Sequence, residues 1–333
     1  MKKEFDDMKK KNKSSGRFLV LLIVIIGALN APVAGIGAEN KGGQDVPSTD
    51  HGDKVTARSL SFVDAAILGL VEGATEYLPV SSTGHLLLTE SILGIAHDPA
   101  SKEAADAYAI VIQAGAILAV LGLYRTRIRQ ILLGLLGRDT DGRMLALNLV
   151  VAFVPAVVIG LLFGDAIKEY LFGVWPVTAA WLVGGILLLA LDKKIPHTQA
   201  GLDIESFQWR HSLGIGLMQC AAMWPGVSRS LATIAGALLM GAGMGAAVEF
   251  SFLLGLITLG AATAYEALKN GHMIIASFGL AGPFIGFLCA FVSAWISVKW
   301  MVGYLQRRGL SIFGWYRIAL ALVVAAVLMG GAK

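Results

Sequence analysis

Charged side chains are scarce in this sequence. Asp, Glu, Lys and Arg together make up 15% of the 333 residues, whereas soluble domains contain about 25%. Hydrophobic residues reach 56%, which excludes a disordered chain and argues against a soluble enzyme. The composition predicts an integral membrane protein, and the length allows about six to nine crossings of roughly 20 residues each.

Cysteine is nearly absent as well. Cys220 and Cys289 lie in apolar stretches outside any Cys-x-x-Cys motif, so the sequence predicts neither a zinc site nor a disulfide framework. We expect both cysteines to be small buried side chains.

The net positive charge belongs to one end of the chain. Residues 1–17 hold seven basic and three acidic side chains, which account for the whole net charge of +4. The remaining 316 residues are neutral overall, so the basic balance does not indicate nucleic-acid binding. It indicates a cytoplasmic flank of a membrane segment, because basic residues accumulate on that side.

The order of polar and apolar stretches predicts three regions. Residues 1–38 combine the basic flank with the apolar run Phe18–Ala28, which is the pattern of a signal peptide or signal anchor. Residues 39–59 are polar and predict an extracytoplasmic linker. Residues 60–333 are almost continuously apolar and predict one membrane-embedded domain.

Six stretches of the third region are long and apolar enough to cross a bilayer. The loops on one side of them are basic, led by the five arginines of Tyr124–Arg143, and the opposite loops hold one lysine each. Because basic loops stay in the cytoplasm, this asymmetry predicts the orientation of every span. The predicted spans are Ala104–Leu123, Met144–Phe163, Val174–Leu191, Val248–Leu268, Met273–Val298 and Ile312–Met329.

Two further apolar segments, Phe62–Ile95 and Ser212–Gly245, are interrupted midway by proline and hydroxyl residues. If each crossed once, the basic loops would fall on the wrong sides, so we expect each to enter the membrane and return. The two segments resemble each other at a constant offset of 147 residues, which matches Ser81 with Ser228. The predicted fold is therefore an all-α integral membrane protein with about six transmembrane helices and two re-entrant broken-helix hairpins related as an inverted repeat. Such folds place their site near the midplane, where broken helices meet.

Ionisable residues in the first hairpin are candidates for function, because charge is costly inside a membrane. Glu72 and Glu76 are four residues apart and share one helix face. Two carboxylates so placed would bind a divalent cation, Mg²⁺ or Ca²⁺, or share protons and orient a base. A solvated helix face is the alternative.

Pro79 breaks that helix and leaves Ser81, Ser82 and Thr83 to cap the next half-helix, whose free N–H groups would bind an anion. His85 follows Ser82 by three residues, so the pair has the spacing of a hydroxyl and a general base. A histidine packed in the core is the alternative.

The second hairpin also has a capped half-helix after its break, and this half-helix carries an arginine. Ser228 caps its second half-helix and Arg229 lies in the first turn, where the helix dipole disfavours a cation unless an anion is present. The guanidinium matches phosphate oxygens bidentately, and Ser230 and Thr233 add hydroxyl donors. An arginine that reaches to the interface is the alternative. Together the two hairpins predict a phosphate or diphosphate ligand with a lipid tail, and a site suited to phosphoanhydride hydrolysis.

The motifs resemble those of a known family. The run Glu72–His85 resembles the acidic and Pro-Val-Ser-Ser-Thr-Gly-His block of bacterial undecaprenyl-diphosphatases, the bacitracin-resistance family, and Pro225–Thr233 matches its Pro-Gly-x-Ser-Arg-Ser block. Glu249–Leu254 and Ile112–Gly115 look like two further family segments, and the likeness covers roughly Leu60–Leu328.

The resemblance implies hydrolysis of undecaprenyl diphosphate to undecaprenyl phosphate and inorganic phosphate at the outer face of the bacterial cytoplasmic membrane. This reaction recycles the lipid carrier of peptidoglycan synthesis. The resemblance also implies bacitracin resistance, dependence on a divalent cation and homodimers. Carried onto this chain, it assigns Glu72 and Glu76 as paired acids, Ser82 and His85 as nucleophile and base, Arg229 as phosphate clamp, and Ser81, Ser228 and Thr233 as supporting donors.

One other function remains open from the residues alone, and another is disfavoured. A polyprenyl-phosphate flippase or transporter would use the same broken helices and repeat. A membrane acid phosphatase would need a second histidine after its Ser-Arg block, and residues 228–245 contain none. Whether His85 would deprotonate Ser82, giving a phosphoserine, or a water molecule also stays open.

Overall fold

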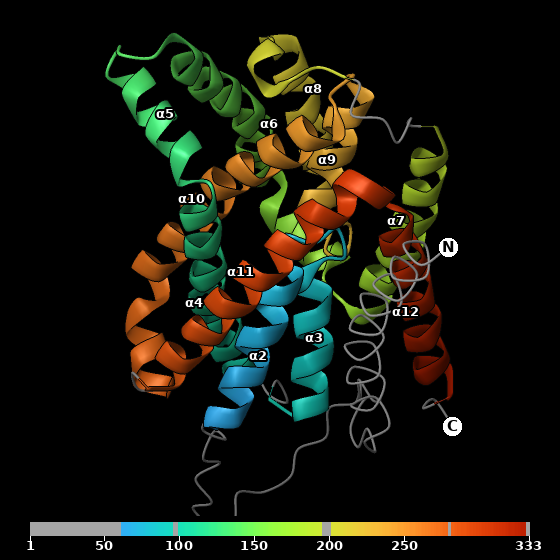
Figure 1. Cartoon of the computed structure of the whole chain (residues 1–333). Helices are drawn as coiled ribbons and strands as arrows, with labels where there is room; N and C mark the ends of the chain where they lie inside the picture. The colour runs from blue at the N-terminus through green and yellow to red at the C-terminus, as the bar shows by residue number, and fades with distance from the viewer. Residues whose placement is uncertain (1–60, 96–98, 195–200, 279–280, 331–333) are drawn as a thin grey trace, which may run out of the picture.

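The computed structural model describes residues 61–95, 99–194, 201–278 and 281–330 (Figure 1). These residues form helices joined by short connections, with one isolated bridge between Leu202 and Ala242 and no β-strand among them. The predicted signal segment 1–38 and linker 39–59 lie outside the described residues.

Long apolar helices dominate the described part of the chain. Five of them are long and apolar enough to span a membrane, and α4 and α5 form a sixth candidate that bends by 81° at Tyr124. The protein is therefore an all-helical, multi-pass membrane protein, as the composition predicts. The bounds are Pro99–Leu123 for α4, Arg125–Leu135 for α5, Thr140–Leu171 for α6, Val174–Lys194 for α7, Met244–Phe278 for α10, Ala281–Arg308 for α11 and Ser311–Gly330 for α12.

Two boundaries differ from the sequence prediction. Met273 was predicted to begin a span, but α10 continues through it to Phe278 and α11 begins at Ala281. The polar residues around Asn270 predict a loop, yet a helix continues until its backbone is capped or turned. The basic stretch after Tyr124 is likewise helical rather than a loop, and α5 packs closely on α6 at Gly134 and Gly142.

Each predicted hairpin consists of two short helices separated by a break. The first contains α2 (Phe62–Thr75) and α3 (Ser82–Leu93), and the second contains α8 (Trp209–Cys220), the 3₁₀ turn η2 (Ala221–Met223) and α9 (Arg229–Leu239). The four α-helices have 11 to 14 residues, a length of about 16–21 Å against about 30 Å for the membrane core. None of the four is therefore long enough to cross alone.

The two breaks have the same backbone geometry. Ser81 and Ser228, which match at the offset of 147, are the two described non-glycine residues with positive φ, at 72° and 78°. Gly69 and Gly216, also 147 apart, each lie against a backbone carbonyl of a neighbouring helix, α11 for the first and α6 for the second. This supports a repeated hairpin, and the inverted relation between the two halves stays a prediction.

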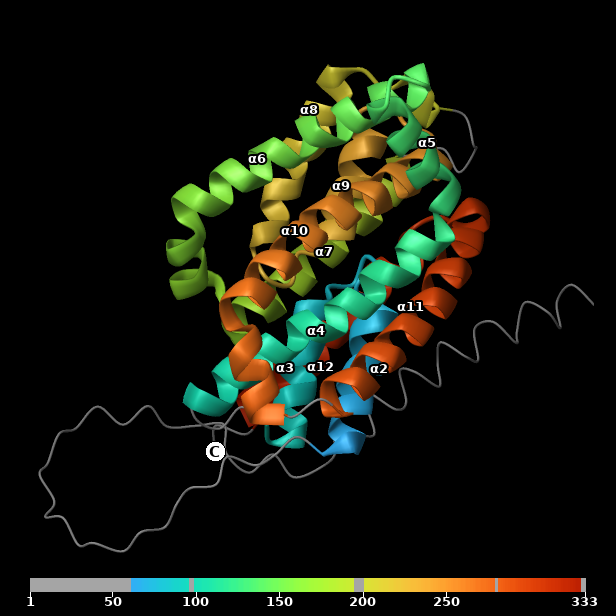
Figure 2. The same ribbon diagram turned by 90° about the vertical axis from the view of Figure 1, so that its left-hand side faces the viewer.

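The breaks of the two hairpins meet inside the helical bundle (Figures 1 and 2). The helix α2 packs on α11 and α4, α8 packs on α6 and α9, and α7 packs on α12. At the centre, the hydroxyl of Ser230 in the second hairpin donates to the carbonyl oxygen of Leu78 in the first at 2.8 Å. The fold thus brings together two segments that are about 150 residues apart in the sequence.

Candidate active site

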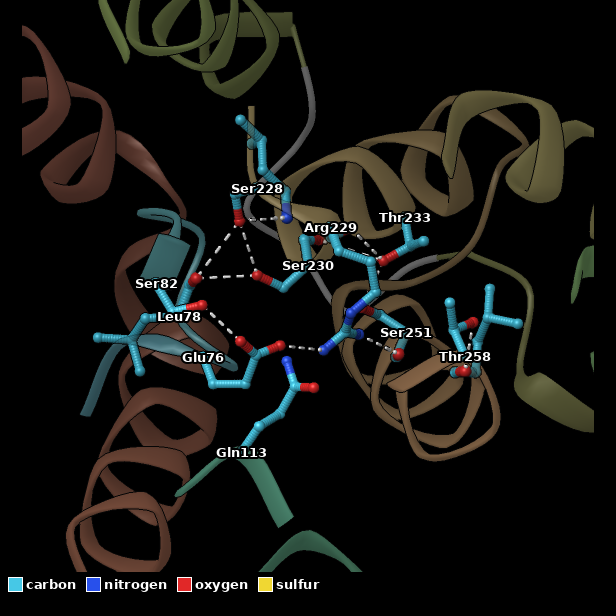
Figure 3. A network of polar contacts seen from close by, with 12 residues as sticks. Glu76, Leu78, Ser82, Gln113, Ser228, Arg229, Ser230, Thr233, Ser251 and Thr258 are labelled. Carbon is cyan, nitrogen blue, oxygen red and sulfur yellow. Dashed lines mark hydrogen bonds and ion pairs between the residues drawn. The ribbon is translucent and has the colours of Figure 1, made fainter. Parts of the chain in front are cut away.

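Glu76, Ser82 and Arg229 form a connected group where the hairpins meet (Figure 3). The Ser82 hydroxyl donates to Oε2 of Glu76 at 2.5 Å. The other carboxylate oxygen, Oε1, lies 3.5 Å from Nη2 of Arg229. An acid, a hydroxyl and a guanidinium predicted from separate motifs therefore lie within reach of one ligand.

Arg229 is held at the start of α9 by its surroundings. Its Nη1 donates to the carbonyl oxygen of Ser251 at 3.0 Å, and its guanidinium lies 5.1 Å from the centre of the Tyr77 ring. A Cβ at residue 255 would collide with the guanidinium, so Gly255 provides the space it occupies. The contact with Glu76 is long, and it leaves the guanidinium able to exchange that partner for a phosphate.

His85 does not form a hydrogen bond with Ser82; each bonds to other groups. Its Nδ1 lies 2.6 Å from the carbonyl oxygen of Ser81, and its Nε2 lies 2.8 Å from the hydroxyl of Tyr316. Because a carbonyl only accepts, Nδ1 carries a proton and donates to Ser81. The predicted Ser82–His85 pair is therefore not formed, because helical spacing places two residues on one face without choosing their partners.

The predicted donors divide into two groups. Ser81, Thr83 and Ser228 border a cavity at the meeting point of the hairpins. Ser230 and Thr233 are fully buried and do not border it: Ser230 donates to Leu78 O, and Thr233 contacts the carbonyl oxygen of Arg229 and the hydroxyl of Ser251. The structure therefore does not bring Ser230 and Thr233 to the place where a ligand would bind.

The cavity has a volume of about 620 Å³ and two kinds of wall. Glu76, Ser82 and Arg229 stand at its polar end. Away from them it is bordered mainly by small and apolar residues of α6 and α10, including Phe153, Val157, Leu161, Leu259 and Ala262. A polar end with an apolar extension suits an amphipathic ligand whose charged group lies at the hairpins.

A second cavity of about 510 Å³ adjoins the first. The two share Ser82, Thr83 and Gln113 on their walls, and the second is also lined by Glu72, Glu90 and Lys168. Ser82 therefore borders both spaces.

Glu72 offers oxygen ligands beside Glu76. Its Oε2 is buried without a hydrogen-bond partner among the described residues, and its carboxyl group interacts with those of Glu76 and Glu90. No cluster of three His, Cys, Asp or Glu side chains suited to a metal occurs in the described ranges. The two carboxylates are compatible with Mg²⁺, because magnesium at phosphate sites is held by one or two carboxylates, with water and phosphate oxygens as its other ligands; the predicted Mg²⁺ or Ca²⁺ stays a prediction.

Two glutamines at the cavity were not predicted as site residues. Gln113 of α4 borders it and accepts from Thr263 at 2.9 Å, and its amide lies beside Glu76 and Arg229 in Figure 3. Gln219 of α8 accepts from Thr258 at 3.3 Å, while its Nε2 is buried with no partner in the described part of the chain. The signal for Gln219 was present, because it matches Glu72 at the offset of 147.

Comparison with known proteins adds an independent result. The family model described as "Bacitracin resistance protein BacA" matches residues 65–323. A protein of Sorangium cellulosum named undecaprenyl-diphosphatase is 45% identical over 266 residues, 79% of this chain and 85% of that protein. A protein of Rhodospirillum rubrum named undecaprenyl-diphosphatase 2 is 44% identical over 81% of this chain and 96% of its own length. A third, from Methylococcus capsulatus and named undecaprenyl-diphosphatase, is 44% identical over 79% of this chain and 93% of its own length.

The matched residues include the second hairpin, all of the first hairpin after its first three residues, and the whole cavity between them. The chain therefore belongs to the bacitracin resistance protein BacA family.

Proposed function

We propose that this protein hydrolyses undecaprenyl diphosphate to undecaprenyl phosphate and inorganic phosphate. The observation that carries the proposal is the group of Glu76, Ser82 and Arg229 at the polar end of a cavity with largely apolar walls. The polar end would receive the diphosphate, and the walls formed by α6 and α10 would receive the first isoprene units. The names of the relatives agree with this substrate.

Binding of the diphosphate would use donors from both hairpins. The first N–H groups of α3 and α9 have no partners within their helices, and the helix dipoles favour an anion there. Arg229 would add two charge-assisted hydrogen bonds, and Ser81, Thr83 and Ser228 would add polar contacts at the cavity wall. Donors arranged before the substrate arrives stabilise the charge that develops in the transition state.

The reaction itself would begin at Ser82. The Ser82 oxygen attacks the terminal phosphorus, its proton passes to Oε2 of Glu76, and the bond from that phosphorus to the bridging oxygen breaks. Undecaprenyl phosphate leaves with the bridging oxygen. Water then attacks the phosphoserine, the Ser82 oxygen recovers a proton, and inorganic phosphate is released.

A divalent cation held by Glu72 and Glu76, Mg²⁺ or Ca²⁺, would neutralise diphosphate charge and polarise the phosphorus–oxygen bonds. Glu72 supports this assignment because it offers a buried oxygen without a protein partner in the described residues.

We further propose that the protein lies in the bacterial cytoplasmic membrane with its active site open to the extracytoplasmic side. The basic stretches after α4, α7 and α11 support this orientation. At that face the reaction would recycle the lipid carrier of peptidoglycan synthesis and confer bacitracin resistance. The family resemblance is the basis for proposing that the protein forms homodimers. Chemical cross-linking in membranes tests this proposal.

Phosphate release from undecaprenyl diphosphate by purified protein in detergent tests the function. We expect turnover that falls on addition of a chelator and is nearly abolished in Glu76→Gln, while Glu169→Gln, an exposed carboxylate of α6, stays active. A flippase would release no phosphate, because transport needs two compartments and hydrolysis needs none. Ser82→Ala distinguishes the two chemical routes. Near-normal turnover in this variant would refute the phosphoserine route and support direct attack of water on the diphosphate.

A further inference from the structure

Arg317 is a fully buried arginine in the first half of α12, Ser311–Gly330. Its guanidinium donates to three backbone carbonyl oxygens: to Pro79 at 3.3 Å, to Ala180 at 2.9 Å and to Gly226 at 2.7 Å. No carboxylate pairs with it among the described residues. A charge inside a membrane is costly, so an arginine that binds only backbone needs an explanation.

The carbonyls that Arg317 binds belong to the breaks of both hairpins. Pro79 precedes Ser81 by two residues, and Gly226 precedes Ser228 by two residues. Those two serines are the described non-glycine residues with positive φ. Such backbone conformations cost about 1–3 kcal/mol each and persist only where the surroundings hold them. Arg317 is therefore bound to the same point in each of the two matching breaks.

The first break is held at each of four successive carbonyls by a side chain. Leu78 O accepts from Ser230, Pro79 O from Arg317, Val80 O from the indole N–H of Trp181, and Ser81 O from His85. Non-helical backbone inside a membrane requires such partners, because lipid offers none. Ser82, the next residue, borders the cavity and bonds to Glu76.

Arginine suits this position better than lysine. Its planar fork reaches carbonyls of three separate segments at once, whereas an ammonium group is a single point of donors. The guanidinium of Arg317 fits beside α7 because residue 184 is glycine, since a Cβ there would collide with Nη2 of Arg317. The same part of α7 thus supplies a carbonyl partner, at Ala180, and the room that the guanidinium occupies.

We propose that Arg317 is a positioning residue that sets the distance between the two hairpin breaks, and through it the distance between Ser82 and Arg229. The role rests on the proposed hydrolysis, which needs both groups on one diphosphate. Arg317 itself does not border either large cavity, so it acts on the reaction only through the backbone.

The test compares two variants that disturb this contact in different ways. Arg317→Lys keeps the charge but not the fork, and Gly184→Ala displaces the guanidinium without removing a polar group. Matched controls are Arg307→Lys, at an exposed arginine of α11, and Gly164→Ala, at a helix position with open space around it. Each protein is purified as a monodisperse species in detergent, and kcat and KM are measured by phosphate release.

Misplacement of reacting groups by about 1 Å can cost on the order of 10²-fold in rate, so we expect kcat to fall about tenfold or more in both variants. The KM should stay within about threefold, because the donors that bind the ground state remain present. Both controls should keep wild-type values. If Arg317→Lys does not accumulate as folded protein, the outcome for Gly184→Ala decides, because alanine is a good helix former and removes no hydrogen-bonding group.

Wild-type kcat and KM in folded Arg317→Lys or Gly184→Ala would overturn the positioning role and leave the proposed hydrolysis intact. A wild-type protein that releases no phosphate would instead refute the hydrolysis itself. The two failures are therefore distinguishable in one assay.

Discussion

The role of His85 can be tested by replacing it with asparagine and with leucine. Both of its ring nitrogens have protein partners: Nδ1 faces Ser81 O at 2.6 Å, and Nε2 faces the Tyr316 hydroxyl at 2.8 Å. The ring stacks on Tyr316 and meets Trp181 edge to face. It borders neither large cavity, which indicates that His85 holds the first break rather than moves a proton.

The two substitutions separate these roles by geometry. The side-chain amide of asparagine occupies nearly the position of Nδ1, so His85→Asn keeps the donor to Ser81 O. Leucine has a similar volume and no donor, so His85→Leu leaves that carbonyl buried and unpaired, at about 1–3 kcal/mol. If all of this energy is lost from the transition state, turnover falls about 5- to 150-fold.

A general base gives a different pattern. Neither asparagine nor leucine accepts a proton near neutral pH, so both variants would lose on the order of 10²- to 10⁴-fold. For a positioning residue we expect His85→Asn to stay within about threefold of wild type, with an unchanged pH–rate profile, and His85→Leu to be much slower.

Phosphate release measured between pH 5.5 and 8.5 distinguishes the two cases, with His211→Asn as control at a histidine near the start of α8. Equal and large losses in both His85 variants, together with a changed acidic limb in the pH profile, would refute the positioning role and show that His85 acts as the general base.

Four further outcomes follow from the site. Arg229→Ala should lower kcat/KM by about 10²- to 10⁴-fold, because two charge-assisted hydrogen bonds of about 1.5–3 kcal/mol each are lost; wild-type kinetics would exclude the clamp. Gln219→Leu should raise KM by about 2- to 10-fold, because its buried Nε2 can donate to the substrate; an unchanged KM would place the substrate elsewhere. Glu72→Gln should raise the Mg²⁺ concentration that gives half-maximal turnover, and equal metal dependence in both proteins would exclude Glu72 as a ligand. Partial burial raises the pKa of Glu205, but hydrogen bonds from its own backbone N–H and from Arg127 outweigh that effect and leave the pKa below its usual value. A lowered pKa contributes stability above the unfolded value that is lost on acidification, so thermal unfolding in detergent should show a stronger decline below about pH 4.3 in wild type than in Glu205→Gln.

The helical architecture was largely readable from the sequence because membrane insertion imposes it. A run of some 20 apolar residues leaves few alternatives to a spanning helix, and Pro79 and Pro225 mark the breaks through their missing N–H groups. The misplaced start at Met273 and the unpredicted helix α5 share one cause. Polar residues predict a loop at both places, yet a helix continues through polar residues until its backbone is capped or turned.

The site was predicted by residue type more reliably than by contact. Charged and hydroxyl side chains are rare in such segments, which points to Glu76, Ser82 and Arg229, and the fold brings these three together. The partner of His85, 231 residues away on α12, could not follow from local spacing. Arg317 was missed although its signal was plain, because it is the one charged residue within the predicted span Ile312–Met329.

Polar residues inside this membrane protein have two distinct uses, and sequence alone does not separate them. A broken helix in lipid leaves carbonyls that only protein can satisfy, so it recruits donors such as Ser230, His85 and Arg317. These residues lie beside the proposed catalytic group and have the same chemistry, which is why a rule that assigns function to every buried polar residue selects too many. Access to the cavity separates the two uses: Ser82 and Arg229 border it, whereas Ser230, His85 and Arg317 do not. The broken helices therefore provide the proposed anion site and, at the same time, require buried donors that resemble catalytic residues.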